Sequence, residues 1–313
     1  MRPTAVALAA FATLAATGAQ ADYPERPIQM IVPFPAGGPV DGVARSFAQT
    51  FESKIKQRVV VMNRDGASTT IGMNALLAAP NDGYTIVYGP ATAITVHLHW
   101  MKGLQFNEKS FVPVCQTFEN VFMLAAGPQT QFKSLENVLT HARARPGALK
   151  YAHPGVVSSP HLTGSELFQR ANVSLVDVPF RGESAMLQPL REGTVDVGVV
   201  TVNFVDIQGL KPFVVFADKR YPSFPEVPTA KELGYPVTPS AYGGLWMRAD
   251  TPTQIVKKVE ATCRATVADP EFKSFAQKNY QATEYLDSVR FAARIRADSS
   301  SKAELLKTVK LEK

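Results

Sequence analysis

The feature that most constrains the fold is a repeated order of apolar strand, small-residue turn and helix. Its first copy combines an apolar run at 28–34, a Pro-Ala-Gly-Gly turn at 35–38 and a helical stretch from 40 to 54. Alternation of this kind predicts parallel strands joined by crossover helices, which is an α/β fold. Further strands are expected at 59–62, 84–88, 121–125, 149–152, 175–180, 195–200, 212–217 and 245–247, and helices at 71–79, 134–144 with Ser134 as N-cap, 159–170 and 184–192.

The C-terminal part of the chain changes this pattern, because it is almost wholly helical from Pro252 onward. Helices that bring no strands of their own must cover a sheet made elsewhere in the chain. A chain of 313 residues also exceeds what one hydrophobic core usually organises. We therefore expect two α/β domains, a discontinuous one made of 22–122 and 243–313 and an inserted one made of 123–242. The expected C-terminal helices lie at 253–268, 270–279 and 286–309.

The N-terminus has the order of an export signal. Arg2 is followed by an apolar stretch at 5–16 and then by Ala-Gln-Ala at 19–21. This order predicts a signal peptide (residues 1–21) that is cleaved after Ala21, and so a periplasmic protein. The apolar stretch is too short for a membrane anchor, which needs about 20 residues. The alternative is the first helix of a cytosolic domain.

Two cysteines, Cys115 and Cys263, would occupy an oxidising compartment after export, where pairing is chemically possible. Cys115 lies in a strand-like run, and Cys263 lies on the expected inner face of an amphipathic helix. We therefore expect two buried, unpaired thiols in preference to a disulfide.

Charge and composition exclude several classes of protein. The 33 Lys and Arg against 27 Asp and Glu give a net charge of +6, but the basic residues are scattered and favour no particular partner. They lack the interleaved aromatic residues of a nucleic-acid surface, and the lysines at 310 and 313 indicate a plain charged tail. A hydrophobic content of 45% with two cysteines excludes disordered chains, collagen and disulfide scaffolds.

Four loops that contain glycine follow expected strands, at 33–38, 89–92, 153–161 and 181–184. Ligands of open α/β sheets bind beyond the carboxyl ends of the strands. Each loop also precedes a helix, whose first N–H groups and dipole favour a carboxylate or a phosphate. The other explanation is that small residues merely permit tight turns. For any single loop the sequence leaves both explanations open.

Signatures of catalysis and of metal binding are weak. The chain has no G-x-S-x-G, G-x-x-x-x-G-K-[ST], G-x-G-x-x-G or H-E-x-x-H motif. Ser158 and His161 would suit an exported hydrolase, but no acid near them in the sequence orients the histidine, so an N-capping serine is the favoured interpretation. His97 and His99 are expected to be solvated or capping residues. We therefore predict no enzyme activity, no metal and no cofactor.

Many short motifs occur in an order that resembles one known family, the Bug-type extracytoplasmic receptors of tripartite tricarboxylate transporters. The resemblance begins near residue 23 and runs into the last helices. The matching residues include Tyr23-Pro24-Glu25-Arg26-Pro27, Val32-Pro33-Phe34-Pro35-Ala36-Gly37-Gly38, Asp41, Asn63-Arg64, Pro80-Asn81-Asp82-Gly83-Tyr84, Pro179-Phe180-Arg181-Gly182 and Pro225-Glu226-Val227-Pro228-Thr229.

This resemblance implies a type II periplasmic binding protein fold, with two α/β domains and a ligand cleft between them. Family members bind small carboxylated solutes and deliver them to a membrane permease without carrying out a reaction. The resemblance therefore implies a receptor for a mono- or dicarboxylate that acts as a monomer with the permease subunits of such a transporter. A sensor subunit that signals to a membrane kinase is the alternative that the sequence leaves open.

The resemblance also assigns candidate ligand-binding residues. The loop 34–38 would cradle one carboxylate through backbone N–H groups and water, with Asp41 fixing the start of the helix. Two further loops would hold the rest of the ligand, and Arg181-Gly182 would line the far wall. The candidates are Phe34, Pro35, Ala36, Gly37, Gly38, Asp41, Gly89, Pro90, Ala91, Thr92, Gly155, Val156, Val157, Ser158, Ser159, Arg181 and Gly182.

The chain departs from the family pattern close to this expected cleft. Ser68-Thr69-Thr70 stands where relatives commonly carry glycine, and His153 lies in a stretch where they carry small residues. His153 is a candidate for an extra donor or a pH-sensitive contact. The segment at 198–203, with the candidates Thr201 and Asn203, lacks the acidic residue of many relatives. A plain carboxylate is therefore favoured over an amino acid, whose ammonium group needs an anion.

Overall fold

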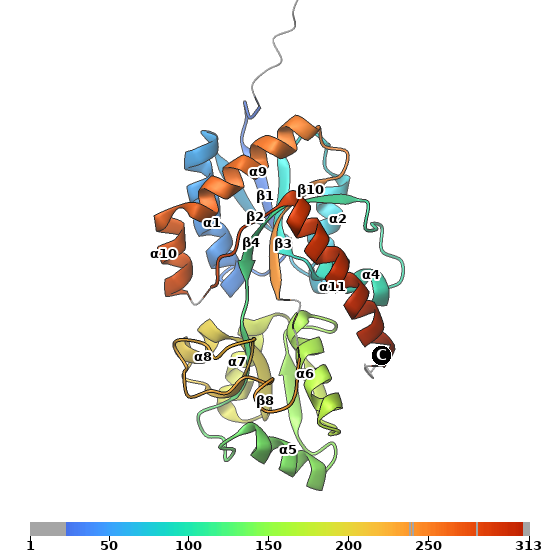
Figure 1. Cartoon of the computed structure of the whole chain (residues 1–313), viewed down its shortest axis with the longest axis vertical. Helices are drawn as coiled ribbons and strands as arrows, with labels where there is room; N and C mark the ends of the chain where they lie inside the picture. The colour runs from blue at the N-terminus through green and yellow to red at the C-terminus, as the bar shows by residue number, and fades with distance from the viewer. Residues whose placement is uncertain (1–22, 238, 240, 280, 309–313) are drawn as a thin grey trace, which may run out of the picture.

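The structure is a computed structural model that describes residues 23–237, 239, 241–279 and 281–308. The predicted signal peptide at 1–21 lies outside the described residues. The described chain forms two lobes, each built around its own sheet (Figure 1).

The sheet of lobe 1 has six strands in the order β11-β4-β10-β3-β1-β2. Strand β1 pairs in parallel with β2 and β3, whereas β10 pairs antiparallel with β3 and β4. The strands are β1 (Ile28–Val32), β2 (Val59–Asn63), β3 (Thr85–Pro90), β4 (Phe111–Glu119), β10 (Tyr242–Arg248) and β11 (Leu286–Asp287). The helices of this lobe are α1 (Pro39–Ile55), η1 (Ala67–Thr69), α2 (Thr70–Ala78), α3 (Thr92–Thr95), α4 (His97–Trp100), α9 (Thr253–Ala268), α10 (Pro270–Lys278) and α11 (Ser288–Thr308).

The sheet of lobe 2 has five strands in the order β7-β6-β8-β5-β9. Strand β6 pairs in parallel with β7 and β8, and β5 pairs antiparallel with β8 and β9. The strands are β5 (Phe122–Ala126), β6 (Lys150–His153), β7 (Val176–Pro179), β8 (Val197–Thr201) and β9 (Lys211–Phe216). The helices are α5 (Leu135–Ala144), α6 (Ser159–Arg170), α7 (Glu183–Glu192) and α8 (Val202–Ile207).

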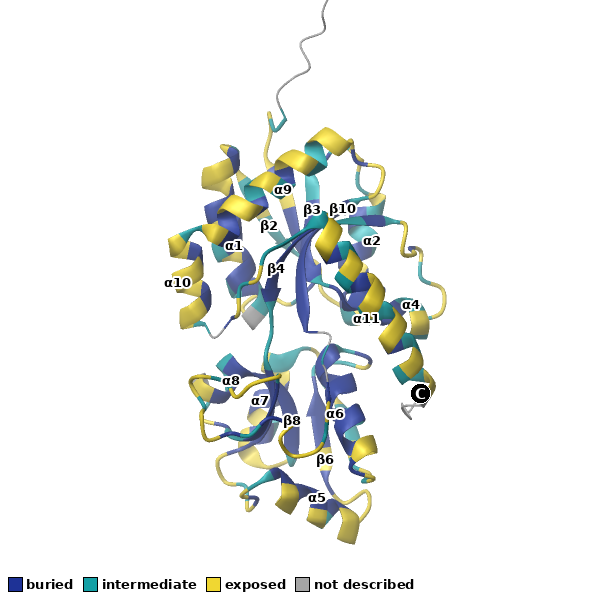
Figure 2. Cartoon of the chain, viewed as in Figure 1, coloured by how far each residue is buried: buried dark blue, intermediate teal, exposed yellow. Residues whose placement is uncertain are grey.

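Both faces of each sheet are covered, which explains why central strands such as β3, β5 and β8 are buried on both faces. On β3, Tyr88 packs in a core with α1, α9 and α10, whereas its neighbour Val87 packs in a second core with α2 and α11. On β5, Leu124 faces α5 and α6, whereas Met123 faces α7 and α8. Figure 2 shows the buried strands at the centre of each lobe and the exposed outer faces of the helices.

The chain crosses between the lobes in two places. Strand β4 runs almost directly into β5, and the segment after β9 returns the chain to β10 (Figure 1). The two crossings are joined where the Asn120 N–H donates to the Ala241 carbonyl oxygen. No helix in the described ranges has both the length and the apolarity to cross a membrane.

Most predicted elements are confirmed, because their signals are local. Helix α6 has the predicted bounds, and the Ser134 side chain caps α5 by accepting the Asn137 N–H. Several local predictions failed. Leu286 begins the short strand β11 and not the last helix, the short helices α3, α4 and α8 were missed, and Gly89-Pro90 belongs to β3 and not to a loop. Glycine at position 243 permits this last pairing, because a Cβ there would lie 2.3 Å from the Gly89 oxygen.

The prediction of unpaired thiols was also wrong, since Cys115 and Cys263 form a disulfide. Helix α9 packs over the face of β4 on which Cys115 lies, and this packing brings the two Cα atoms to 6.7 Å. The residues are 148 apart in the sequence, so only the tertiary structure brings them together.

Candidate functional site

The loop at 34–38, which we call loop A, follows β1 and is tied down by Asp41 on the first turn of α1. The Asp41 side chain accepts hydrogen bonds from the Gly37 N–H at 2.9 Å, from Asn63 at 2.8 Å and from Arg45 at 2.9 Å. Burial raises the pKa of Asp41, but these hydrogen bonds outweigh it and hold that pKa below its usual value. Asp41 is therefore a charged anchor beneath a loop whose tip, Pro35 to Gly37, is exposed.

The segment at 89–92 offers a ligand less main chain than was expected of a free loop. The Gly89 carbonyl oxygen accepts from Trp246 Nε1 at 3.1 Å, and the Ala91 N–H donates to the Tyr242 carbonyl oxygen at 2.9 Å. Pro90 pairs with Gly243 of β10, and Thr92 is buried. The sheet therefore already uses much of this segment.

A segment that the sequence marked only as a departure, 67–70, reaches the other lobe. Ala67, Ser68 and Thr69 all have positive φ angles, of 43°, 50° and 79°. Residues other than glycine rarely adopt this backbone conformation. In this conformation the Ser68 hydroxyl donates to the Val156 carbonyl oxygen in lobe 2 at 2.9 Å. Ser68 is thus a direct polar link between the lobes, and it was not among the predicted site residues.

The loop at 155–159 of lobe 2, which we call loop B, follows β6 and leads into α6. Gly155 and Val157 have positive φ, at 141° and 61°, and the Ser158 side chain caps the helix by accepting the His161 N–H at 3.3 Å. Val157 is buried in an apolar seam between the lobes, where its partners include Val96 of lobe 1. A Cβ built on Gly155 would lie 3.8 Å from the Ser68 hydroxyl, so loop B faces segment 67–70.

Two stacked histidines and an aspartate lie beneath loop B. The rings of His153 and His161 are 4.0 Å apart at an interplanar angle of 14°. His153 Nε2 lies 3.0 Å from one oxygen of Asp177, and His161 Nε2 lies 3.3 Å from the other. Burial raises the pKa of Asp177, but the hydrogen bonds and charges of the two histidines keep it well below its usual value. Burial lowers the pKa of His161 despite its hydrogen bond to Asp177.

Ser158 and His161 do not form a nucleophile and base, although an acid does orient the histidine. His161 Nδ1 accepts the Val157 N–H at 2.7 Å, and its Nε2 faces Asp177. Both ring nitrogens are therefore engaged by groups other than the serine hydroxyl. The acid that orients His161 is not near it in the sequence, because Asp177 comes from strand β7. The N-cap role of Ser158 is confirmed.

The predicted far wall, Arg181 and Gly182, lies against loop A. A Cβ on Gly182 would lie 3.6 Å from Pro35 Cγ. Arg181 is exposed, and within the described ranges no carboxylate forms an ion pair with it. Thr201 and Asn203 lie beside Glu183, whose carboxylate accepts from the Thr201 hydroxyl at 3.0 Å. Burial raises the pKa of Glu183 to about 7, although hydrogen bonds from Thr201 lower it.

The prediction that His97 and His99 are solvated or capping residues was wrong for His97. His97 is 1% exposed, and burial lowers its pKa to about 4. His99 Nε2 lies 2.7 Å from the Ser299 hydroxyl on α11.

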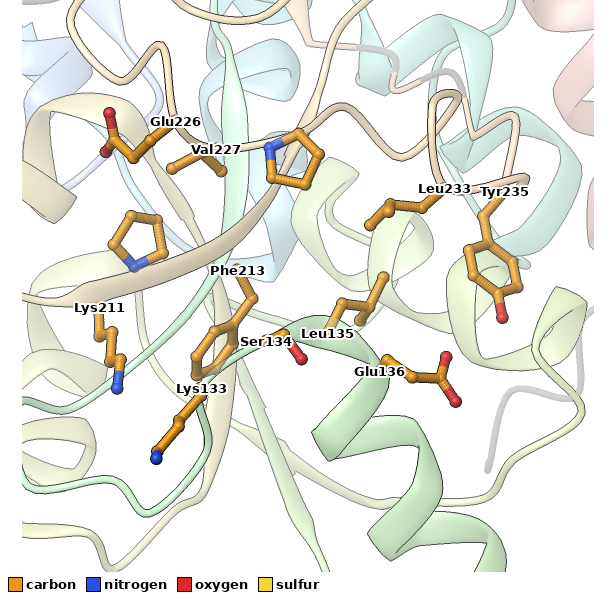
Figure 3. A pocket seen from close by; sticks show the side chains of 12 residues that line it. Lys133, Ser134, Leu135, Glu136, Lys211, Phe213, Glu226, Val227, Leu233 and Tyr235 are labelled. Carbon is orange, nitrogen blue, oxygen red and sulfur yellow. The ribbon is translucent and has the colours of Figure 1, made fainter.

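A pocket of about 540 Å³ lies elsewhere, on lobe 2 (Figure 3). It is formed by the start of α5, the start of β9 and the segment at 226–235. Lys133, Lys211 and Glu226 place both signs of charge around its apolar floor. None of the predicted site residues lines this pocket.

The contacts bring four segments together at the junction of the lobes. Loop A meets Gly182, and segment 67–70 meets loop B. Helices α1 and α7 begin directly after loop A and Gly182, and α6 begins at Ser159, the last residue of loop B, so the positive N-terminal ends of all three lie at this junction. Two α/β lobes joined by crossing strands define the class of two-domain periplasmic binding proteins.

Comparison with known proteins gives the family. The family model described as "Tripartite tricarboxylate transporter family receptor" matches residues 43–311. The chain is 34% identical to the protein BugT of Bordetella pertussis over 234 residues, which cover 72% of each protein. The chain belongs to this receptor family, and the resemblance seen in the sequence is confirmed.

Solved structures agree with this assignment. The periplasmic binding protein BugD superposes with a TM-score of 0.84 at 27% identity, over 92% of this chain and 98% of BugD. MatC from Rhodopseudomonas palustris, solved with bound malate, superposes with a TM-score of 0.82 at 26% identity, over 91% of this chain and 100% of MatC. The predicted type II periplasmic binding protein fold is confirmed.

Proposed function

We propose that this chain is a periplasmic receptor that captures a small mono- or dicarboxylate between its lobes and delivers it to the permease of a tripartite tricarboxylate transporter. The family assignment and the malate bound by MatC support a carboxylated ligand. The proposal includes export with cleavage after Ala21. It also includes a hinge at the two crossings, which join the discontinuous domain (22–122 and 243–313) to the inserted domain (123–242).

The observation that carries the proposal is the meeting of three helix N-termini at the junction of the lobes. Helices α1, α6 and α7 have 17, 12 and 10 residues, so each directs the positive end of its dipole toward the junction. The free N–H groups of α1 and α6 are fewer, because Pro39 and Pro160 carry no N–H and Ser158 already caps the His161 N–H. Such ends bind carboxylates without a cationic side chain. Asp41 satisfies only the Gly37 N–H of loop A, and Arg181 adds an exposed cation at the edge of the junction.

Calorimetry tests the proposal directly. The refolded, ligand-stripped protein is titrated with malate, succinate, adipate and monocarboxylates, and with amino acids because Glu183 lies close to the junction. We expect a carboxylate to bind and to raise the melting temperature by mass action. Silence across all carboxylates, or tighter binding of an amino acid, would contradict the proposed ligand class.

A matched pair of variants tests the position of the ligand. Arg181→Met should weaken carboxylate binding by about 1.5 to 3 kcal/mol, the range for a charge-assisted hydrogen bond. Arg191→Met removes the same charge from the last turn of α7, far from its N-terminus, and should leave the Kd unchanged. Equal effects of the two substitutions would remove Arg181 from the site.

Uptake tests the delivery to a permease. Cells that lack the receptor should lose high-affinity uptake of the carboxylate that binds in calorimetry, and the wild-type chain should restore it. Arg181→Met should restore uptake only at higher solute concentrations. Undiminished uptake without the receptor would instead favour a sensing role.

A further inference from the structure

The imidazole rings of His153 and His161 both form hydrogen bonds to the backbone of loop B, each to a different residue of the loop. His161 Nδ1 accepts the Val157 N–H at 2.7 Å. His153 Nδ1 lies 2.8 Å from the Gly155 carbonyl oxygen and 3.3 Å from the Gly155 nitrogen. His153 is fully buried, so its contacts are not shared with bulk water.

These contacts determine the protons on the two rings. Because His161 Nδ1 accepts a hydrogen bond, its proton is on Nε2, which faces Asp177. His153 Nδ1 has two possible partners in Gly155. Without a proton, Nδ1 accepts the Gly155 N–H, and with a proton it donates to the Gly155 carbonyl oxygen. When Nε2 keeps its proton toward Asp177, a proton on Nδ1 makes the ring a cation.

The same three side chains have the residue types of a metal site, and their donor atoms lie within 4.8 Å of one another. However, the rings are stacked 4.0 Å apart at an angle of only 14°, so the lone pairs of their Nε2 atoms lie in nearly parallel planes and do not converge on one ion. His161 Nε2 also carries the proton. The geometry therefore favours a shared response to a proton over a metal.

We propose that His153, held by Asp177 and stacked on His161, is a positioning residue whose protonation frees the Gly155 N–H for the ligand carboxylate, so that the receptor binds its anion more tightly at lower pH. The inference rests on the proposed function, because it assumes that loop B contacts a carboxylate. Two effects act in the same direction: a backbone donor is released, and a positive charge appears beneath an anion site.

Several other titratable groups lie around His153, and they differ in whether they change protonation state near neutral pH. Tyr151, on the same strand, donates its hydroxyl to the Pro160 carbonyl oxygen, and burial raises its pKa well above the usual value. His97, across loop B, has a pKa lowered to about 4 and stays neutral. Asp177 stays ionised. Glu183 is different, because α7 packs against β6 and its pKa, raised by burial to about 7, lies in the same range as an imidazole.

The test is the pH dependence of malate or adipate binding, whichever binds more tightly, between about pH 8 and about pH 6, where imidazoles titrate and carboxylates stay ionised. We expect the wild type to bind about tenfold more tightly at the lower pH. His153→Asn keeps a donor near the Gly155 oxygen but cannot take up a proton, and its Kd should not change with pH. His141→Asn, the same substitution on the distant helix α5, should behave like the wild type.

Glu183→Gln separates the two groups that titrate in this range. It keeps an oxygen that can accept from Thr201 and removes the titration. We expect Glu183→Gln to retain most of the pH dependence. If Glu183→Gln abolishes it while His153→Asn retains it, the inference is overturned. A wild-type Kd that does not change with pH also overturns the inference while leaving the proposed function intact.

A measurement without ligand keeps the inference testable if no carboxylate binds. In the ¹⁵N-labelled protein, the Gly155 amide and the His153 ring nitrogens should titrate together, and this shared transition should disappear in His153→Asn. A Gly155 amide that ignores the protonation of His153 overturns the inference. If Gly155 and His153 titrate together but no carboxylate binds, the coupling between His153 protonation and loop B is supported and the proposed function is contradicted.

Discussion

Loops A and B both precede a long helix at the junction of the lobes, but different chemistry holds them in place. Loop A is anchored by the carboxylate of Asp41, which Arg45 keeps ionised from the next turn of the same helix. Loop B is anchored by imidazole rings, which share Asp177 from a neighbouring strand. A carboxylate anchor stays constant over the neutral pH range, whereas an imidazole anchor responds within it. The two walls of one site can therefore differ in their sensitivity to protons.

The disulfide gives the largest expected difference between the lobes, because both cysteines belong to lobe 1. Replacing both cysteines by alanine should cost about 2 to 5 kcal/mol, since the disulfide closes a long loop in the unfolded chain. Both tryptophans, Trp100 and Trp246, lie in lobe 1, so guanidinium unfolding followed by tryptophan fluorescence reports on that lobe. An unchanged unfolding midpoint would mean that the disulfide does not make lobe 1 more stable.

Asp41→Ala should break the anchor of loop A. The substitution leaves the exposed Gly37 N–H and the half-buried Asn63 amide without this acceptor, and we expect a loss of about 1.5 to 3 kcal/mol in the free energy of unfolding, with weaker carboxylate binding. Asp250→Ala is the control, because Asp250 is half exposed in its ion pair with Arg248 and such a pair is expected to add little to stability. Similar losses in the two variants would show that Asp41 is an ordinary surface carboxylate.

The pH dependence of stability should separate the two anchors. The pKa of Asp41 is lowered by folding, so its contribution is complete above about pH 4 and is lost below that value. The pKa of His161 is also lowered, so the unfolded chain takes up its proton first and stability falls as the pH drops below about 6.5.

We therefore expect Asp41→Asn to differ from the wild type by a constant amount between about pH 7 and about pH 5, and His161→Gln to differ by an amount that changes over the same range. The limit is about 1.4 kcal/mol per pH unit for one proton. Urea unfolding at each pH provides the measurement. Parallel curves for the wild type and both variants would contradict the comparison.

The smallest expected effect concerns the contact between the lobes. Ser68→Ala removes the hydrogen bond to the Val156 carbonyl oxygen and should weaken ligand binding by about 0.5 to 1.5 kcal/mol, without a comparable loss of stability. Ser53→Ala removes a hydroxyl that bonds within α1 and should leave binding unchanged. If Ser68→Ala lowers stability and not affinity, the contact supports the strained segment and not the closed arrangement.

Predictability from the sequence follows the range of the interactions involved. The caps Ser134 and Ser158 each bond to a backbone N–H three residues ahead, so a short pattern was sufficient to predict them. His161 lies in helix α6, whereas the acid that orients it, Asp177, lies 16 positions later on strand β7, and no local pattern connects the two. The link from Ser68 to Val156 spans 88 positions and depends on backbone conformations that propensities disfavour.

The sequence by itself determined the alternation of strands and helices, the helix caps and the small-residue turns at strand ends, because these depend on each residue's own backbone and close neighbours. Only the tertiary structure decided that Cys115 meets Cys263, that Asp177 contacts two stacked histidines, and that Gly182 lies against loop A. Those contacts join segments whose approach depends on the packing of whole helices and sheets, and that packing depends on the combined side chains of each core.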